Sequence, residues 1–455
     1  MTPTSYISHL SSIEDTICAL ATAPGGALGI IRVSGPKAFH AVSSLCSIDC
    51  TNCSPNTVHY TRITDSQDDI DEVMVSVFRS PHSYTGEDSV EISCHGSRYI
   101  LNKVLELLCQ KGCRLAGPGE YTMRAYLNGK MDLSQAEAVA DLIASSNKAT
   151  HQIAMSQLRG HFSSELAQLR EQLLKLTSLI ELELDFSDHE DLEFANRSEL
   201  LTLAKEIDNR VSRLVQSFEA GLALKQGIPV AIVGKTNVGK STLLNQLVGD
   251  NRAIVSDIHG TTRDTIEETM EINGVQFRFI DTAGIRNTTD EIEQIGISRT
   301  YATIAKARIV LWLFDELPCE TEIHDMQEHC QGKALIHIQN KIDKMNALLL
   351  SSALQISAKK GIGIDTLRQA IFKAANLKEL SDTDVIVTNA RHYDALLRAQ
   401  NSIQRVINGL QMQLSGDLLS EDLRQAIDIL AEITGGQITP QETLNNIFSH
   451  FCVGK

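Results

Sequence analysis

The sequence is poor in positive charge: 41 Lys and Arg face 57 Asp and Glu over 455 residues, which gives a formal net charge of −16 at pH 7. The mean field of such a chain repels phosphate, so a nucleic-acid or anionic-membrane partner would need a local basic patch or a second protein. Glycine (28) and proline (9) are also few, which excludes collagen-like and largely disordered classes. The length predicts about three domains.

Signals for secretion and membrane insertion are missing as well. No Lys or Arg precedes Arg32, and the longest strongly apolar run is Ile309–Phe314, far below the roughly 20 residues of a membrane span. We therefore expect a soluble, cytoplasmic chain without a membrane partner. Ten cysteines are too few for a disulfide scaffold, so reduced thiols are expected.

Three of these cysteines form a possible metal motif. Cys46, Cys50 and Cys53 have the C-x3-C-x2-C spacing of iron–sulfur enzymes that use S-adenosylmethionine. The position before the last cysteine, often aromatic in that motif, is Asn52. We expect solvated loop thiols and keep a cluster as the alternative; Cys109 and Cys113 are expected to be semi-buried.

The first 130 residues mix short β-rich runs with a helix. This pattern predicts a small α/β or α+β domain, with strands at Thr16–Ala21, Gly29–Val33, Glu72–Phe78 and Ser89–Cys94 and a helix at Ser97–Lys111. Helical periodicity then runs from 134 to about 221. Within it, residues 181–193 hold seven acids and no Lys or Arg, which predicts a solvated face, with a metal or partner site as the alternative.

A strand, glycine loop, helix pattern repeats from about 225 to 378 and predicts a mostly parallel sheet. Its strands are expected at Pro229–Val233, Val275–Ile280, Ile309–Phe314, Leu335–Gln339 and Leu354–Ile356. The predicted fold is multidomain α/β, with an N-terminal α/β domain (1–130), a helical domain in two parts (131–224 and 381–455), and a P-loop GTPase domain inserted between them (225–380).

The segment from Gly234 to Ser241 fits G-x4-G-K-[ST], between the apolar run PVAIV and an amphipathic start, TLLNQL. Its glycines let backbone N–H groups curl around phosphate, and a helix N-terminus adds positive potential. Lys240 would reach the β- and γ-phosphates, and Ser241 would ligate Mg²⁺. The loop residues expected to contact GTP are Asn237, Val238, Gly239, Lys240, Ser241 and Thr242.

Three further segments select the base and complete the site. Asp281, Thr282, Ala283 and Gly284 follow a predicted strand and suit a Walker-B-like Asp with a glycine N–H on the γ-phosphate. The second segment is Asn340, Lys341, Ile342 and Asp343. The Asp343 carboxylate can accept hydrogen bonds from guanine N1–H and from the N2 amine, two donors that adenine lacks. Ser357, Ala358 and Lys359 would supply a backbone N–H for guanine O6. These motifs follow one another along the chain in the same order as in GTPases of the translation-factor superclass.

Hydrolysis needs a group that these motifs do not provide. Many signalling GTPases carry a water-orienting Gln after the DTAG-type glycine, and here the residue is Ile285. Another polar group or a partner must act instead, and acids follow at Asp290, Glu291 and Glu293. Arg263 and Arg286 are nearby, but no arginine finger is assignable, and a monovalent cation could supply the missing charge.

The whole chain resembles one family, the bacterial tRNA modification GTPases of the MnmE (TrmE) type. The resemblance rests on IIRVSG (30–35), SYTGEDSVEISCHG (83–96), PGEYTMRAYLNGKMDLSQAEAVADLI (118–143), LDFSDHED (184–191), DIHGTTRD (257–264) and FCVGK (451–455). It implies GTP hydrolysis with Mg²⁺ and K⁺, a homodimer, and a FAD-dependent partner in a heterotetramer. Their substrate is the wobble uridine (position 34) of certain tRNAs, modified at C5 to aminomethyl or carboxymethylaminomethyl forms.

The resemblance also implies site residues. A tetrahydrofolate derivative (5-formyl or methylene) would be held by Arg32, Glu91, Lys130 and Lys455, and Glu293 would position the attacking water. The K⁺ ligands would be Asn237, Ser256, Ile258 and Thr261, the second Mg²⁺ ligand Thr262, and the further nucleotide contacts Asp257, His259 and Gly260. Cys452 matches the family's C-terminal cysteine, and its role stays open between function and a plain helix-end thiol.

A regulatory GTPase, for example one of ribosome assembly, is the alternative function. That class typically appends a basic RNA-binding module, and the chain has no such stretch. From the acid excess we expect this chain to contribute little tRNA affinity, with the flavoprotein partner supplying most of the positive surface.

Overall fold

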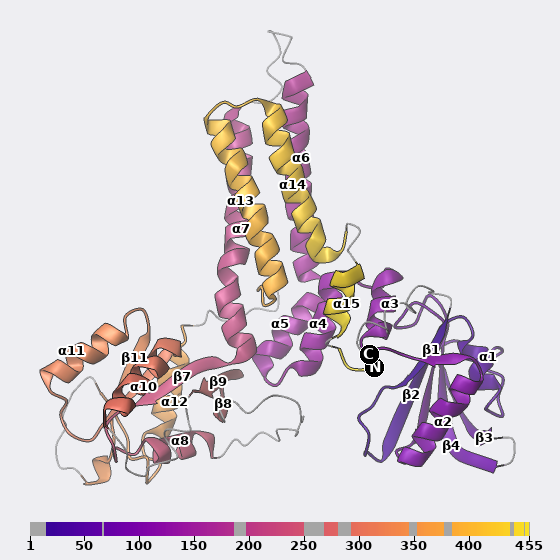
Figure 1. Cartoon of the computed structure of the whole chain (residues 1–455), viewed down its shortest axis with the longest axis horizontal. Helices are drawn as coiled ribbons and strands as arrows, with labels where there is room; N and C mark the ends of the chain where they lie inside the picture. Colours follow the sequence, from indigo (N-terminus) through magenta and orange to yellow (C-terminus); the bar gives the residue numbers. More distant parts are fainter. Residues whose placement is uncertain are drawn as a thin grey trace. The chain divides into compact units, whose positions relative to one another are not determined.

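The computed structural model describes residues 15–65, 68–185, 197–249, 268–280, 293–344, 353–376, 385–436, 441–449 and 451–454. The chain divides into two compact units, the first of residues 1–143, 157–204 and 401–455 and the second of 144–156 and 205–400. The division falls inside α7 (Arg197–Gln226) and α13 (Ala390–Gln411), so each of these helices contributes to both units (Figure 1).

The first unit contains a six-stranded sheet in the order β3-β4-β5-β2-β1-β6. All neighbours are antiparallel except the parallel pair β1–β6. The strands are β1 (Thr16–Leu20), β2 (Leu28–Ser34), β3 (Thr57–Asp65), β4 (Asp68–Phe78), β5 (Ser89–His95) and β6 (Cys113–Leu115). The predicted strands are found, with β4 starting earlier than expected, whereas β3 and β6 were not predicted.

One face of this sheet packs in a core with α1 (Ala38–Ser43) and α2 (Arg98–Gln110). Alternate residues of β2, β4 and β5 point into it, as period-two patterning requires. On the other face, α3 (Glu120–Leu127) buries Tyr121 against Ile17 of β1. Farther along, Val58, Tyr60 and Met74 are exposed, so part of this face is apolar and open.

The second unit contains another six-stranded sheet, ordered β12-β11-β10-β7-β9-β8. It is parallel except for β8, as predicted for a P-loop domain. Its strands are β7 (Ile228–Val233), β8 (Glu268–Ile272), β9 (Val275–Phe279), β10 (Ile309–Phe314), β11 (Ala334–Gln339) and β12 (Leu354–Gln355). Buried cores lie on both faces, one with α8 (Lys240–Val248) and α12 (Ile364–Ala374), the other with α10 (Glu293–Lys306) and α11 (Glu320–His329).

The β8–β9 hairpin was not predicted, although its turn, Asn273–Gly274, is a strong hairpin signal. The start of α5 (Lys148–Leu158) holds this turn: the Ala149 N–H donates to the Gly274 carbonyl at 2.9 Å. A Cβ at Gly274, whose φ is +82°, would lie 2.9 Å from Lys148 Cβ. Residues 144–156 therefore pack within the second unit, beside the hairpin.

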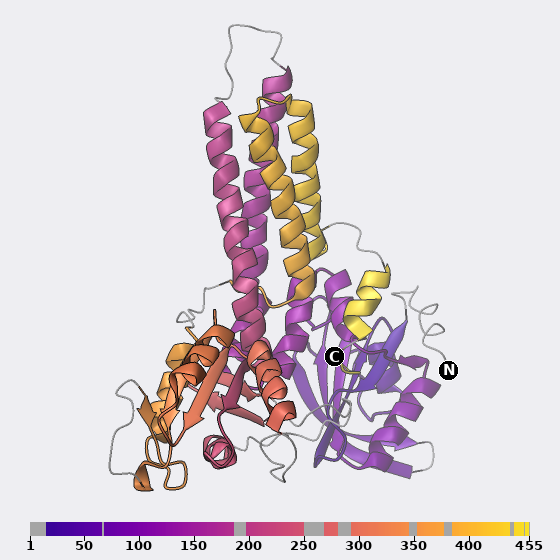
Figure 2. The ribbon, with the colours of Figure 1, turned by 60° about the vertical axis from the view of Figure 1, so that its left-hand side comes forward.

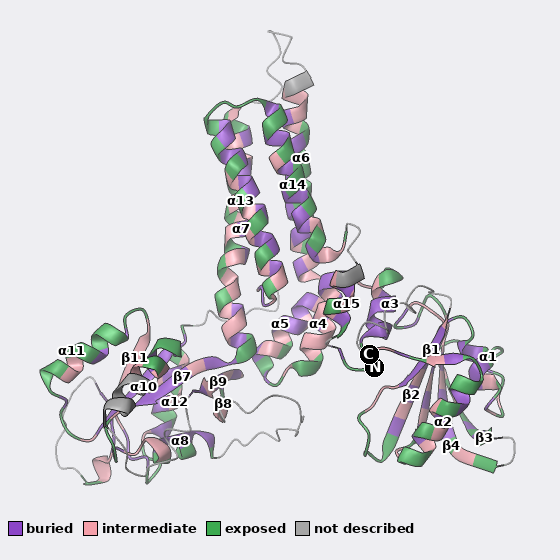
Figure 3. Ribbon diagram, in the orientation of Figure 1, coloured by how far each residue is buried: buried purple, intermediate pink, exposed green. Residues whose placement is uncertain are grey.

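Helices make up most of the remainder, including α4 (Leu133–Ala144), α6 (His161–Asp185), α14 (Gly416–Thr434) and α15 (Gln441–Ser449). In the first unit α6 packs along α14 (Figure 2). Buried and exposed residues alternate around both helices (Figure 3). The predicted apolar stripe of α6 is buried, namely Leu166, Leu169, Leu173, Leu176 and Ile180. No helix within the described ranges is long and apolar enough to cross a membrane.

One expectation from the sequence stays a prediction and another needs correction. Residues 186–193 of the acidic segment lie outside the described residues, and just before them Glu181 pairs with Arg424 at 2.8 Å and Glu183 with Arg197 at 2.9 Å, both as partly exposed surface pairs. The thiols of the C-x3-C-x2-C motif, in contrast, are not solvated. Cys50 is fully buried, and Cys46 and Cys53 pack half-buried against the same core.

A contact between distant segments explains why these cysteines are buried. The Arg79 guanidinium donates to the Cys50 and Cys53 carbonyls and holds the loop against the sheet. Burial raises the pKa of Cys46 to about 12, which disfavours the thiolate that a metal needs. In the part of the chain that the structure describes, no group of three or more His, Cys, Asp or Glu could hold a metal ion. Cys109 is exposed and Cys113 buried, rather than semi-buried.

Candidate functional site

The glycine loop follows β7 and ends at the first residue of α8, as the sequence motif requires. Gly239 has a φ of +99°, and a Cβ there would lie 2.4 Å from the Asn340 amide nitrogen. Gly234 has a φ of +149°, and a Cβ there would lie 2.3 Å from the Leu313 carbonyl. Both glycines are therefore required by backbone conformation and by space.

Lys240 folds back over this loop. Its ammonium donates to the Gly234 carbonyl at 2.6 Å and to the Lys235 carbonyl at 2.8 Å. Burial lowers its pKa, because a low-dielectric surrounding disfavours the charged form. Ser241 and Thr242 follow in the first turn of α8, half-buried and exposed respectively. An ammonium, a hydroxyl and a helix N-terminus thus converge at the loop, which is the set that a polyphosphate needs.

Asn340 joins three of the predicted motifs. Its side chain is buried, donates to the Val238 carbonyl at 2.7 Å, and accepts from the Ala358 N–H at 3.0 Å. The phosphate loop, the segment after β11 and the segment after β12 are therefore connected through one amide. The sequence places Asn340 among the GTP contacts but gives no sign of this bridging position.

Asp343 lies beside this bridge in a single 3₁₀ turn, Ile342–Lys344. The Ser357 hydroxyl donates to its carboxylate at 2.7 Å and lowers its pKa, which keeps it ionised as an acceptor for ring N–H groups. Lys341 pairs with Asp315 at 2.6 Å, and Lys359 is exposed. These loops all leave the carboxyl ends of neighbouring strands, where ligands of open α/β sheets bind.

Several predicted site residues lie outside the described residues and stay predictions. They are Ser256, Asp257, Ile258, His259, Gly260, Thr261, Thr262, Arg263, Asp281, Thr282, Ala283, Gly284, Ile285, Arg286, Asp290, Glu291 and Lys455. Glu293 is the first residue of α10, and its side chain is not described.

A second candidate site lies on the open face of the first unit's sheet. Arg32 of β2 and Glu91 of β5 are register partners and form an ion pair at 2.7 Å. The Arg32 guanidinium lies over the rings of Tyr84 and Tyr121, at 5.5 and 5.6 Å from their centroids, and donates to the Gly454 carbonyl at 3.3 Å. The sequence pointed to Arg32 and Glu91 but missed both tyrosines and Gly454.

Lys130 approaches this site through the loop that carries Tyr84. Its ammonium donates to the Pro81 carbonyl at 2.9 Å, and its stem lies against Gly86. The C-terminal segment is held nearby, since the Gly119 N–H donates to the Cys452 carbonyl at 3.3 Å. The Cys452 residue itself is exposed. The structure thus brings Arg32 and Glu91 into contact and sets Lys130 one loop away.

A buried ionic network supports this site from α3. Arg124 is 4% exposed and bonds to Asp15, Glu87 and Glu120. Burial alone would raise the pKa of Glu120, but hydrogen bonds from Arg114 and the Gly117 N–H outweigh it and lower the pKa. Because both partners are charged and hydrogen-bonded, the network fixes α3, and with it Tyr121, against β2.

The chain is similar to known proteins over nearly its full length. The family model of the MnmE helical domain matches residues 133–452, and that of the GTP-binding protein TrmE N-terminus matches residues 16–130. The tRNA modification GTPase MnmE of Bacteroides thetaiotaomicron is 53% identical, covering 97% of this chain and 100% of the relative. That of Phocaeicola vulgatus is 52% identical, covering 97% and 99%. Among solved structures, the G domain of the T. maritima FeoB iron transporter is 23% identical with a TM-score of 0.25, covering 32% of this chain and 98% of that chain.

Proposed function

The chain belongs to the MnmE family of tRNA modification GTPases, and on this premise we propose a specific reaction for it. It is a GTP hydrolase that acts in tRNA modification. Hydrolysis is stimulated by K⁺, and together with a FAD-dependent partner the chain modifies C5 of the wobble uridine, position 34, to aminomethyl or carboxymethylaminomethyl forms.

The bridge made by Asn340 is the observation that carries GTP as the nucleotide. It joins the phosphate loop, with Lys240, to the loop in which the ionised Asp343 can accept two hydrogen bonds from guanine. Ser241 would hold Mg²⁺ with Thr262, and Mg²⁺ would neutralise charge between the β- and γ-phosphates. Ser241 is half-buried and directly follows Lys240 in the first turn of α8, which fits that role.

K⁺ would be held by Asn237 with Ser256, Ile258 and Thr261. Asn237 is exposed in the loop with a φ of +62°, so its side chain is open to a ligand. The cation would supply the positive charge for which the sequence offers no arginine. Glu293 would position the attacking water in place of the glutamine that Ile285 replaces.

The tetrahydrofolate derivative would occupy the Arg32 site, with Glu91, Lys130 and Lys455, and would supply a one-carbon unit. A carboxylate beside a guanidinium that contacts the faces of two aromatic rings suits a flat, hydrogen-bonding ring system with acidic groups. The exposed apolar residues Val58, Tyr60 and Met74 on the same sheet support a homodimer formed through this unit. With a net charge of −16, the chain would leave most tRNA contacts to the flavoprotein.

Mass spectrometry of wobble nucleosides tests the proposal. Deleting the gene should remove the 5-aminomethyl and carboxymethylaminomethyl uridines, and re-expression should restore them. Unchanged nucleosides would favour the regulatory alternative.

Comparing the rates of GTP turnover in KCl and in NaCl tests the proposed K⁺ site, and equal rates would argue against it. Full turnover by Glu293→Ala would show that Glu293 does not position the attacking water. If the chain alone bound tRNA as tightly as the complex with its partner does, the proposal that the flavoprotein makes most of the tRNA contacts would be refuted.

A further inference from the structure

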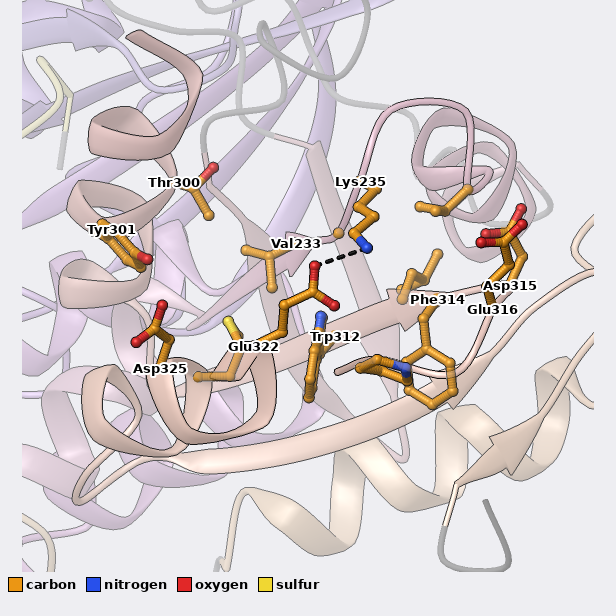
Figure 4. A pocket seen from close by; sticks show the side chains of 15 residues that line it. Val233, Lys235, Thr300, Tyr301, Trp312, Phe314, Asp315, Glu316, Glu322 and Asp325 are labelled. Carbon is orange, nitrogen blue, oxygen red and sulfur yellow. Dashed lines mark ion pairs between the residues drawn. The ribbon is translucent and has the colours of Figure 1, made fainter. Parts of the chain in front are cut away.

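Charged groups lie beside aromatic rings at two places in the chain, and their surroundings differ. One place is a cavity of about 250 Å³ between the phosphate loop, β10, α10 and α11 (Figure 4). There Lys235 pairs with Glu322 at 2.7 Å, and the other acids Glu316 and Asp325 are exposed to water. The other place is the Arg32 site, where the rings around the charge are held by hydrogen bonds from inside the protein.

Tyr84 forms one wall of the Arg32 site. The Arg32 guanidinium lies 5.5 Å from the centre of its ring, a distance at which a ring face attracts a cation. Tyr84 belongs to residues 79–88, which connect β4 to β5 and form neither helix nor strand. Because no regular backbone pattern fixes the direction of this side chain, its own contacts must orient it.

The contact that orients the ring is a hydrogen bond between two hydroxyls. The Tyr84 hydroxyl lies 2.8 Å from the Thr122 hydroxyl, and Thr122 is fully buried in α3. Within the described part of the chain, neither hydroxyl has another hydrogen-bond partner. Burial raises the pKa of Tyr84, so its hydroxyl stays protonated at neutral pH and keeps this bond. The bond therefore fastens one end of the ring to α3.

Two consecutive residues of α3 hold the two rings beside the guanidinium. Tyr121 donates to the Arg32 carbonyl at 2.8 Å, and its own ring centre lies 5.6 Å from the guanidinium. Thr122 holds the second ring, that of Tyr84. The guanidinium, which pairs with Glu91 at 2.7 Å, thus has a fixed orientation before any ligand arrives.

The segment that carries Tyr84 is also anchored without Thr122. The Glu87 carboxylate accepts from the Ser34 hydroxyl at 2.7 Å and from the Arg124 guanidinium at 3.1 Å. Loss of the Thr122 hydroxyl should therefore release the Tyr84 ring and leave the segment in place. An effect on ring orientation can thus be separated from a general loss of structure.

We propose that Thr122 is a positioning residue of the Arg32 site. Its hydroxyl fixes the Tyr84 ring against the guanidinium, and the ring keeps Arg32 in the orientation that receives a ligand. Groups arranged in advance bind more tightly, because less side-chain freedom is lost on binding. Without the Thr122 hydroxyl, the Tyr84 hydroxyl gains by turning to water, since this residue is already 38% exposed. The inference rests on the proposed function, in which a tetrahydrofolate derivative occupies this site.

Calorimetric titration of the full-length chain with 5-formyltetrahydrofolate measures the effect on binding. The parent is compared with Thr122→Val, which removes the hydroxyl and keeps the shape of the side chain, and with Thr122→Ser, which restores a hydroxyl. Thr61→Val is the matched control, because Thr61 is buried on β3 of the same sheet and its hydroxyl has no partner among the described residues.

Nitration by tetranitromethane, mapped by mass spectrometry, measures the orientation of the ring without any ligand. The reagent attacks the ionised form of tyrosine, so a Tyr84 hydroxyl that leaves its buried position should react faster. Tyr99, which is 68% exposed on α2, is the internal reference.

We expect Thr122→Val to weaken folate binding by about 2- to 30-fold, which corresponds to loss of one cation–π contact. Nitration of Tyr84 should rise relative to Tyr99, and Thr122→Ser and Thr61→Val should bind like the parent. Tyr84→Leu removes the ring at an exposed position and should weaken binding over the same range, so the inference can be tested even if Thr122→Val does not fold.

Parent-like binding by Thr122→Val or by Tyr84→Leu overturns the inference, and so does equal weakening by Thr122→Ser or by Thr61→Val. Unchanged nitration of Tyr84 in Thr122→Val overturns it as well. If the parent binds no 5-formyltetrahydrofolate, the proposed ligand is wrong. The nitration measurement then still decides whether Thr122 holds the ring, because it uses no ligand.

Discussion

Replacing Asn340 by alanine should destabilise the second unit before any nucleotide is bound. The substitution removes the acceptor of the Ala358 N–H and the donor to the Val238 carbonyl. Asn340 is 2% exposed, so water cannot readily replace the lost amide. Each buried group left without a partner costs about 1–3 kcal/mol, so the free energy of unfolding should fall by about 2–6 kcal/mol.

Urea unfolding of the full-length chain, followed by Trp312 emission, measures this loss. Trp312 lies on β10 of the same unit, so its transition reports on the part that Asn340 bridges. The midpoint should fall without a change in slope. Asn209→Ala, at an exposed position of α7 in the same unit, is the control and should shift the midpoint little.

Hydrogen exchange locates the effect. The Ala358 amide should lose protection in Asn340→Ala before the strands of the sheet do. If the variant unfolds within about 0.5 kcal/mol of the parent, a range typical of neutral surface changes, and the Ala358 amide stays protected, the bridge contributes nothing and the reasoning is wrong.

Three further predictions concern other parts of the chain. The lowered pKa of Glu120 means that its ionised form stabilises the fold above its ordinary pKa of 4.5, and that this contribution is lost as the pH falls through the lowered value. When the urea midpoint is measured by circular dichroism at a series of pH values, Glu120→Gln should therefore show a smaller fall at acid pH than the parent. An unchanged pH dependence would contradict this role of Glu120. Gly274→Ala adds a Cβ at a φ of +82° against Lys148, so the melting temperature should fall and the free energy of unfolding should drop by about 1 kcal/mol or more. The control Gly332→Ala, at a φ of +75° in open space, should lower the free energy of unfolding less. Lys240→Met should weaken binding of a fluorescent GTP analogue at least about tenfold while leaving the urea midpoint near that of the parent, since a loss of one charge-assisted contact costs about 1.5–3 kcal/mol; retained affinity would count against the loop as the phosphate site.

The sequence predicted those parts of the fold that depend on neighbouring residues. An apolar run such as Ile309–Phe314 forms a strand with the predicted bounds, because burial on both faces needs no polar alternation. The phosphate loop was equally predictable, since its glycines serve a local backbone path. Edge strand β3 was missed because exposed residues interrupt its apolar positions.

Contacts between distant segments could not be predicted. The loop around Cys50 has the composition of a solvated segment, yet Arg79 draws it onto the sheet. The surroundings of Arg32 likewise combine Tyr84, Tyr121 and Gly454 from three separate stretches. Spacing within one stretch cannot reveal such a meeting, because it is decided by how sheet and tail pack.

The contact between Arg32 and Gly454 also fixes an order of events during synthesis. The two residues are 422 positions apart, and translation at about 5–20 residues per second separates their appearance by roughly 20–80 s. During that interval the guanidinium can pair with Glu91 and meet both tyrosines, but it has no tail to bond. All strands of this sheet precede residue 116, so the sheet can assemble before Gly454 is made, and the Arg32 site acquires this carbonyl later than its other contacts.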